Sequence, residues 1–306
     1  HFSTSLKQRD AMLHAMQQEV NSRSSELDAP VGTIYFGGGT PSLMSEQELG
    51  SFIAQAKSTF QVDANAEVTL EANPDDITSE RLAAWRSIGI TRISLGTQSF
   101  REDRLRWMGR AHTAEHALAS IDLIAKAGIA SWTIDLIYGL PGMTLEEWDE
   151  QLTIALDHGV PHLSAYCLTV EPRTALAHQV KQAMVHMPGD DDQSAQFDRL
   201  MERMETAGLD HYEISNFGKP GHHSRHNTAY WEGVPYLGIG PSAHSFNGTT
   251  RRWNVSNNAR YIKALDEGTR YWEQEILTAA QRTNEALLTG LRTSAGVAVE
   301  RLEMDA

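Results

Sequence analysis

The stretch IAKAGIASWTIDLIYG, residues 124–139, decides the fold class of this chain. It begins as the last turn of an amphipathic helix, and Gly128 stands where that helix must end. Glycine adopts the left-handed conformation that closes a helix without steric cost. The run that follows is apolar and rich in β-branched residues, which is typical of a buried strand. A helix, a closing glycine and a buried strand together indicate one repeat of an α/β fold.

The same repeat recurs along the chain. Glycine precedes three further apolar runs: Gly89 before ITRISLGTQ, Gly159 before VPHLSAYCLTV and Gly208 before LDHYEISNF. Two helix starts, Ser45 with Glu48 and Thr144 with Glu147, have the spacing of a capping box. Six strands are predicted in all, near residues 33, 67, 92, 132, 162 and 211. Strands that alternate with helices predict a parallel sheet, here a partial TIM-like (β/α)6 barrel.

The pattern changes at about residue 236. Glycine and proline interrupt it between 238 and 248, and two helices are predicted beyond, near 257–267 and 279–292. We therefore predict two domains, a barrel over 1–235 and a mainly helical C-terminal appendage over 236–306. The chain opens directly in a helical pattern and stops without an end signal, so we expect both ends to be cut.

Composition excludes several classes of protein. The net charge is -14, from 26 basic and 40 acidic residues, which argues against binding to nucleic acid or to anionic membrane. No apolar run is long enough to span a membrane, and the first residues do not resemble a signal peptide. Cys167 is the single cysteine, so an intrachain disulfide is excluded. We expect a cytoplasmic protein that is not an integral membrane protein.

Polar residues stand at the ends of several predicted strands. Alternation points Asp135 away from the apolar neighbours Ile134 and Leu136, and a buried carboxylate needs a partner. Glu71 and Gln98 occupy similar strand ends, and Arg110 follows Gln98 on a connection. In barrels of this kind the functional face is the one at the strand C-termini.

Those four side chains suit a zwitterionic nucleoside. Arg110 would hold its carboxylate, Glu71 its ammonium group, and Gln98 and Asp135 its two ribose hydroxyls. The alternative for any one of them is a structural ion pair with arginine. Gly38, Gly39 and Thr40 form a glycine-rich turn after the first predicted strand, where backbone N–H groups can approach a ligand or simply make a tight turn.

Five segments together make a family resemblance specific. GGGTPSLMS, LEANPDD, RISLGTQSF, IDLIYGLPGMT and YLGIGPSAHSF resemble the oxygen-independent coproporphyrinogen III oxidase family of radical S-adenosylmethionine (radical SAM) proteins. The resemblance implies a radical SAM barrel. It also implies that S-adenosylmethionine contacts seven positions: Gly38, Gly39, Thr40, Glu71, Gln98, Arg110 and Asp135.

The chain departs from this family in one respect. Family members carry a CxxxCxxC motif on the first barrel strand, whose thiolates hold a [4Fe–4S] cluster. That motif is absent here, and Cys167 lies on a later predicted strand, where it is expected to fill apolar space. The chain as given therefore lacks the cluster cysteines, and we expect that its first strand is missing.

A second constellation is the run HHSRHNTAYW, residues 222–231. In a helix, His226 and Tyr230 would share a face, as would Asn227 and Trp231. His226-Asn227-x-x-Tyr230-Trp231 resembles the HNxxYW motif of the haem chaperone branch of the family, called HemW. The resemblance implies haem contacts at His226, Tyr230 and Trp231, with His226 as the ligand of the haem iron. The alternatives are a structural histidine, or an adventitious metal on the histidine cluster.

The resemblance implies a haem chaperone, which binds haem and passes it to an acceptor protein; a respiratory enzyme is one candidate acceptor. S-adenosylmethionine and the cluster would have a supporting role. The alternative is an oxygen-independent coproporphyrinogen III oxidase, and a third interpretation is metal-assisted hydrolysis on an unrelated barrel. His244, within GPSAHSF, is a further candidate beside the site, against the alternative of a structural hydrogen bond.

Overall fold

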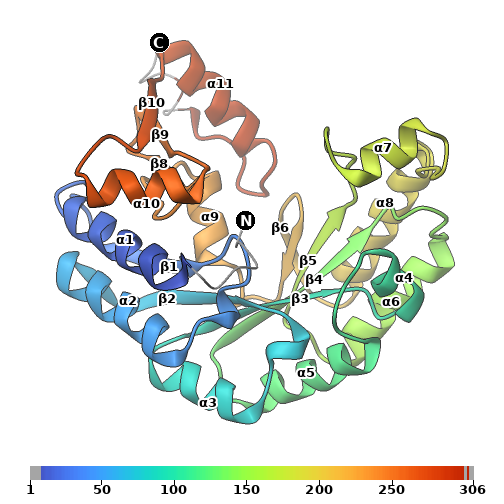
Figure 1. The fold of residues 1–306 in the computed structure, drawn as a ribbon. Helices are drawn as coiled ribbons and strands as arrows, with labels where there is room; N and C mark the ends of the chain where they lie inside the picture. The colour runs from blue at the N-terminus through green and yellow to red at the C-terminus, as the bar shows by residue number, and fades with distance from the viewer. Residues whose placement is uncertain (1–7, 300–301, 303–306) are drawn as a thin grey trace. The chain divides into compact units, whose positions relative to one another are not determined.

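The computed structural model describes residues 8–299 and residue 302, and its ribbon is drawn in Figure 1. The chain forms two compact units that are discontinuous in sequence. Unit 1 comprises residues 1–39, 44–68 and 224–306, and unit 2 comprises residues 40–43 and 69–223. The predicted division into domains at residue 235 stays a prediction.

Unit 2 contains most of the repeats that the sequence predicts. Its strands are the end of β2 (Val62–Ala72), β3 (Arg92–Gln98), β4 (Ser131–Tyr138), β5 (His162–Cys167), β6 (Asp210–Glu213) and β7 (Asn216–Gly218). Its α-helices are α3 (Ser79–Ser87), α4 (Glu102–Trp107), α5 (Ala114–Lys126), α6 (Leu145–Asp157), α7 (Ala175–Lys181) and α8 (Asp190–Thr206). Two 3-10 turns, η2 (Pro41–Leu43) and η3 (Pro74–Asp76), complete it. The helices α3, α5 and α6 cover one face of the strands (Figure 1).

The sheet confirms the α/β barrel prediction up to its last strands. β2, β3, β4 and β5 pair in that order and in parallel. β7 then pairs with β5 antiparallel, and β6 pairs with β7. The sixth predicted strand is therefore not the parallel neighbour of the fifth. Only Ile214 and Ser215 connect β6 to β7, and a connection this short can join only antiparallel strands.

Local sequence explains where the helices begin and end. Gly128 has a φ of 66°, the left-handed geometry that was predicted for a closing glycine. The capping box at Ser45 and Glu48 is present. At the start of α6, Thr144 accepts the Glu147 N–H, but the carboxylate of Glu147 binds Arg104 at 2.7 Å. The second predicted capping box is therefore only half formed, because an arginine takes the carboxylate.

The two faces of the unit 2 sheet differ in chemistry. Ile93, Leu95, Ile134 and Leu136 are fully buried against the helices. The residues between them present a polar face, formed by Ser94, Thr133, Asp135 and Ser164. Burial of the apolar face supplies the driving force for the fold, at about 1.5–3 kcal/mol for each large side chain. On this face Ser94, Thr133 and Ser164 are buried, whereas Asp135 is partly exposed.

Unit 1 combines the first elements of the chain with the last. It contains α1 (Arg9–Ser22), β1 (Val31–Phe36), α2 (Glu46–Thr59), the beginning of β2, α9 (Arg225–Trp231), β8 (His244–Phe246), β9 (Thr250–Asn254), α10 (Asn258–Asp266), β10 (Trp272–Ile276) and α11 (Ala279–Gly290). β1 lies beside β2, and β8, β9 and β10 form a separate antiparallel sheet in the order β10-β9-β8. The two helices predicted near 257–267 and 279–292 are present, as α10 and α11.

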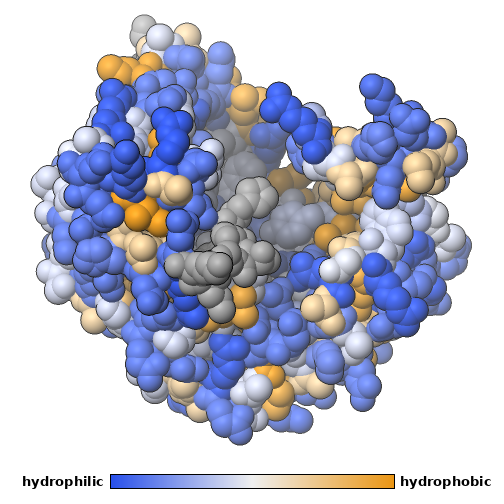
Figure 2. Space-filling view, viewed as in Figure 1, coloured by the Kyte–Doolittle hydropathy of each residue, from blue (hydrophilic) through white to orange (hydrophobic). Residues whose placement is uncertain are grey.

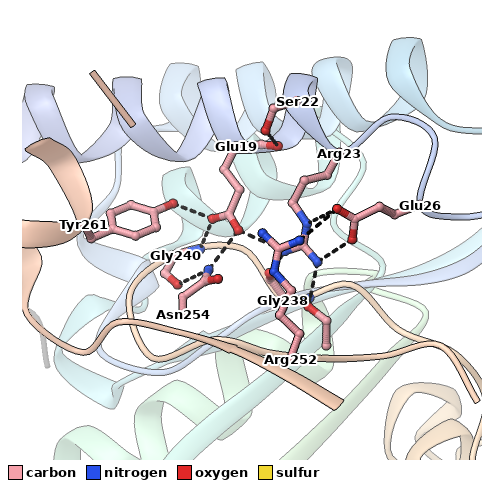
Figure 3. Close-up of polar contacts among 10 residues, drawn as sticks. Glu19, Ser22, Arg23, Glu26, Gly238, Gly240, Arg252, Asn254 and Tyr261 are labelled. Carbon is pink, nitrogen blue, oxygen red and sulfur yellow. Dashed lines mark hydrogen bonds and ion pairs between the residues drawn. The ribbon is translucent and has the colours of Figure 1, made fainter. Parts of the chain in front are cut away.

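A buried polar network joins α1 to the C-terminal elements of unit 1 (Figure 3). Glu19 and Arg23, one helical turn apart, form an ion pair at 2.9 Å with 0% and 2% of their side chains exposed. Glu19 also accepts hydrogen bonds from Asn254, Tyr261 and the backbone of Gly240. Every oxygen of this buried carboxylate is thereby satisfied, as a charge in the protein interior requires.

No helix in the described part of the chain is long and apolar enough to cross a membrane. The visible surface is mostly hydrophilic, with scattered apolar side chains (Figure 2). Single exposed apolar residues are normal for a folded domain.

Candidate functional site

The polar face of unit 2 is centred on Asp135, in β4. Its neighbour across the sheet is Ser164 of β5, and the Ser94 hydroxyl lies 3.5 Å from its Oδ2. Burial, together with the negative charge of Glu71, raises the pKa of Asp135 to about 7. Asp135 forms no ion pair with arginine in the described residues, so the structural ion pair considered from the sequence is not found. The carboxylate can accept hydroxyl hydrogen bonds from a ligand.

Gln98 and Arg110 meet over Gly96, at the end of β3. A Cβ built on Gly96 would lie 3.1 Å from Gln98 Nε2 and 3.3 Å from Arg110 Nη2, so the absence of a side chain there leaves room for both. A register shift between Leu95 and Gln98 ends the regular pairing, and Gln98 has a φ of 66°. A non-glycine residue seldom adopts this conformation, and such strain is frequent at functional sites.

Arg110 is a half-buried guanidinium whose hydrogen-bond acceptors, within residues 8–299, are neutral. It donates to Asn73 Oδ1 at 2.8 Å and to the Gly96 carbonyl at 3.3 Å. Burial lowers its pKa, and the charges of Asp75 and Asp135 oppose that effect without reaching ion-pair distance. Among the described ion pairs, none includes Arg110, so its charge is suited to binding an external carboxylate.

The glycine-rich turn follows β1. Gly38 has a φ of 78°, and a Cβ added to it would meet no other atom within 4 Å. Its backbone conformation, rather than a lack of space, therefore requires glycine. Thr40 belongs to unit 2, whereas Gly38 and Gly39 belong to unit 1. The roles predicted for these three residues stay predictions.

Cys167 does not provide a cluster site. Its thiol lies 3.3 Å from Gln193 Oε1, and burial raises its pKa. Across the residues that the structure describes, no three histidine, cysteine or carboxylate side chains are grouped so as to hold a metal ion. A [4Fe–4S] cluster needs several thiolates, so this chain's residues do not fit the cluster, whereas Arg110 and Asp135 fit S-adenosylmethionine.

The second candidate site lies in unit 1 at His226, in α9. The helix confirms the spacing predicted from the sequence, since the rings of His226 and Tyr230 meet edge to face at 4.9 Å. The imidazole is also stacked on Tyr35 of β1, with ring centroids 4.6 Å apart. His226 Nδ1 forms a hydrogen bond of 2.8 Å with the Thr33 hydroxyl. Strand β1 and helix α9 therefore fix the ring together.

The start of α9 is anchored on strand β2. Glu67 accepts the backbone N–H groups of Arg225 and His226, and the Ser224 hydroxyl accepts the N–H of Asn227. A carboxylate at a helix N-terminus also interacts favourably with the helix dipole. These bonds hold the first turn of the helix, and with it the backbone of His226, in one position.

The electrostatics of His226 suit a metal ligand. Burial lowers its pKa to about 4, so the ring is neutral at physiological pH. With Nδ1 bound to Thr33, the other ring nitrogen, Nε2, has no hydrogen-bond partner within the described part of the chain. A second hydrogen bond that orients a ligating imidazole is the usual arrangement at metal sites.

The neighbouring predicted residues differ in their surroundings. Tyr230 is 45% exposed and contacts Tyr236 edge to face at 4.6 Å. Trp231 forms none of the described ring contacts, and its predicted haem contact stays a prediction. His223 stacks on Tyr212 and its Nε2 lies 3.1 Å from Asp210 Oδ2. These contacts give His223 a structural role. The histidine cluster considered from the sequence does not form a metal site in the described residues.

Sequence reasoning missed several partners of these sites. Thr33 and Tyr35 are 193 and 191 positions away from His226 along the chain, and no local pattern links them. Asn73 could have been found, because it follows Glu71 in the segment LEANP at a strand end.

Several known proteins are similar to this chain over most of its length. Residues 15–153 match the family model described as the Radical SAM superfamily. The protein named Heme chaperone HemW of Bacillus subtilis (strain 168) is 34% identical over 295 residues, which are 95% of this chain and 78% of that protein. The protein of the same name from Lactococcus lactis subsp. lactis (strain IL1403) is 34% identical, covering 96% of this chain and 76% of that one.

A solved structure supports the same assignment. Coproporphyrinogen III oxidase (HemN) from Escherichia coli, a radical SAM enzyme, superposes with a TM-score of 0.79 and 25% identity, over 94% of this chain and 70% of that one. The partial α/β barrel predicted from the sequence is therefore confirmed. Radical SAM proteins of this family use S-adenosylmethionine and a [4Fe–4S] cluster. The chain belongs to the HemW haem chaperone family of radical SAM proteins.

Proposed function

We propose that this protein binds haem through His226 and delivers it to an acceptor protein. The observation that carries the proposal is the state of the His226 ring, which is neutral and bonded to Thr33 through one nitrogen, while the other nitrogen has no partner among residues 8–299. A neutral imidazole is a common ligand of haem iron. The relatives from Bacillus subtilis and Lactococcus lactis are named haem chaperones, which supports the proposal that this protein binds haem.

Aromatic residues beside His226 support the binding of a flat macrocycle. Tyr230 presents an exposed ring next to the imidazole, and Tyr236 extends that surface. Aromatic contact supplies most of the favourable burial for such a ligand. An exposed site also suits a carrier, because the haem must reach another protein; a respiratory enzyme is our candidate acceptor. The reduced lone cysteine agrees with a cytoplasmic location.

We also propose that unit 2 binds S-adenosylmethionine. Arg110 would hold its carboxylate, Glu71 its ammonium group, and Gln98 and Asp135 its ribose hydroxyls. Thr40, the residue before η2, would be a further contact. When bound, S-adenosylmethionine supplies an adenosyl group for radical chemistry or acts as a structural ligand. Because this chain lacks the cluster cysteines, we derive no reaction step from it.

The haem proposal is tested by titrating ferric haem into His226→Ala, His222→Ala and His223→Ala. We expect His226→Ala to shift the Soret band and weaken binding, whereas the other two keep the parent's behaviour because their rings lie outside the motif. Circular dichroism verifies that each variant is folded. Parent-like binding by His226→Ala would contradict the proposal, and a deficit confined to His222→Ala or His223→Ala would move the ligand upstream.

The S-adenosylmethionine proposal is tested by calorimetry on Arg110→Ala and Asp135→Ala. Arg110→Ala removes a charged donor, and we expect a loss of about 1.5–3 kcal/mol in binding free energy. Asp135→Ala removes an acceptor whose pKa is about 7, and we expect a loss of about 0.5–1.5 kcal/mol. Lys126→Ala, on the outer helix α5, is the matched control. Unchanged affinity for S-adenosylmethionine in both variants would show that Arg110 and Asp135 have a structural role only.

The alternative function is that of a coproporphyrinogen III oxidase, which the likeness to HemN favours. The two functions are separated by an anaerobic assay for decarboxylation of coproporphyrinogen III, on a form of the protein that carries the family's CxxxCxxC motif and a reconstituted cluster. We expect no turnover. Turnover that depends on Arg110 and Asp135 would favour the oxidase instead.

A further inference from the structure

The aromatic surface around His226 continues well beyond its motif. We define this surface by Tyr35, His226, Tyr230, Tyr236 and Phe246, all in unit 1. Successive rings lie 4.6, 4.9, 4.6 and 6.3 Å apart. Tyr236 and Phe246 also exchange two backbone hydrogen bonds, at 2.8 and 2.9 Å. The aromatic surface therefore runs from α9 onto strand β8.

Alternation along β8 places one more histidine on that surface. His244 and Phe246 are two residues apart in the strand and so share a face. Ser245 between them is buried on the opposite face, where its hydroxyl accepts a hydrogen bond from Arg23. That opposite face is the buried network of Glu19, Arg23 and Asn254 (Figure 3). The network thus fixes which side chains of β8 point outward.

The His244 ring is exposed and open to a ligand. It makes no hydrogen bond in the part of the chain that the structure describes, and its nearest ring is Trp253, at 6.3 Å. The backbone of His244 lies close to Gly238, where an added Cβ would overlap the His244 carbonyl oxygen. Glycine at position 238 therefore permits this close approach of the two backbone segments. The Gly238 carbonyl is itself held by Arg23 at 2.8 Å.

Accordingly, we propose that His244 is a second ligand for haem iron on the aromatic surface, used when haem moves outward from His226. The inference rests on the proposed function. The transfer is a ligand exchange: the bond from iron to His226 Nε2 breaks and its electron pair returns to that nitrogen. The lone pair of a His244 ring nitrogen forms the new bond, with no electron transferred. The fixed, half-buried His226 would bind haem more tightly than the exposed His244.

The test is a titration of ferric haem into four forms of the protein: His226→Ala, His244→Ala, the double variant, and His226→Ala combined with His14→Ala. His14 is a histidine of the same unit that bonds to Gln18 on α1, which makes it a matched control. We expect His226→Ala to keep a weaker site with a shifted Soret band. Removal of His244 should weaken that remaining site by about tenfold or more, whereas removal of His14 should not.

The outcomes separate the inference from the function on which it rests. Equal residual binding with and without His244 overturns the inference, and so does complete loss of haem from His226→Ala alone. Parent-like binding by His226→Ala contradicts the proposed function. In that case the single His244→Ala variant decides the inference, since loss of haem supports a ligand at His244 and parent-like binding overturns it.

Discussion

A histidine holds haem iron when its ring is neutral, oriented and open at one nitrogen. In His226 these conditions have separate causes. Burial keeps the ring neutral, the Thr33 hydroxyl binds Nδ1, and stacking on Tyr35 sets the ring plane. Removal of Thr33 or Tyr35 would therefore change how the ring is held without removing the ligand itself.

The low pKa of His226 predicts how haem binding responds to acid. An imidazole with the ordinary pKa of about 6.5 would be mostly protonated at pH 5.5, but one with a pKa of about 4 stays neutral there. We expect haem affinity to be flat from pH 8 to pH 5.5. The apoprotein also loses stability as pH falls from 6.5 towards 4, because the unfolded histidine binds the proton more readily.

The measurement is the chemical shift of the His226 ring, followed by NMR across this pH range in the apoprotein. The signal is assigned by its absence from His226→Ala. A titration midpoint near pH 6.5 would show that the His226 ring is not buried as described. A haem affinity that decreases below pH 6.5 would lead to the same conclusion.

Gln98 is the residue at which function and stability are expected to conflict. Its left-handed backbone, with a φ of 66°, is strained for any residue that has a Cβ. Gln98→Gly relieves that strain, and we expect it to raise the free energy of unfolding by about 1 kcal/mol. The same change removes the amide, so S-adenosylmethionine should bind more weakly.

Gln98→Ala is the control, because it removes the amide but keeps the strain. Urea denaturation measures stability, and calorimetry measures binding. If Gln98→Gly is no more stable than Gln98→Ala, the backbone is not strained in solution.

Among the helices and strands, the sequence predicted those elements whose position depends on neighbouring residues. The closing glycines and apolar runs identified the six strands, because helix ends and buried strands depend on neighbouring residues. The β6–β7 hairpin was missed because NFG is too short to show a period. The sheet formed by β8, β9 and β10 was missed as well, since its strands carry polar residues such as Arg251 and Arg252.

The contacts of the His226 site likewise differ in how far the sequence could predict them. His226 and Tyr230 are one helical turn apart, so their contact could be predicted from spacing. Thr33 and Tyr35 could not, because only the fold brings β1 beside α9. Likewise, the sequence could not predict that Glu147 binds Arg104 instead of completing the capping box with Thr144, because Arg104 lies on a different helix.

Glu19 and Arg23, at the end of helix α1, form a buried ion pair with side chains 0% and 2% exposed, and both also bond to C-terminal elements of unit 1. Loss of one partner leaves the other charge buried, at a cost of about 3–5 kcal/mol. We expect Arg23→Met to destabilise the protein by this amount. Lys263→Met is the control, because Lys263 and Glu267 form an exposed ion pair with the same spacing, worth about 0–1 kcal/mol.

Urea denaturation of both variants tests this difference. Similar losses in Arg23→Met and Lys263→Met would mean that the network around Glu19 contributes little. Because Arg23 also binds the Gly238 carbonyl and Ser245, its loss should in addition loosen strand β8, and His244 with it.

At the scale of the whole molecule, the chain combines two candidate sites on separate units. Unit 2 carries the polar face around Asp135, and unit 1 carries His226 on its aromatic surface. Fold similarity alone does not separate a chaperone from an oxidase, because HemN matches the fold at a TM-score of 0.79. We propose that the residues around His226 carry that distinction, so that haem binding depends on one imidazole.

The most direct test of that claim is chemical rescue of His226→Gly. This change opens a space where the ring stood, and free imidazole can enter it and ligate the iron. We predict that His226→Gly loses the parent haem spectrum and that added imidazole restores it, whereas His222→Gly retains the parent spectrum throughout. A parent-like spectrum in His226→Gly without imidazole would contradict the account, because another residue would then hold the iron.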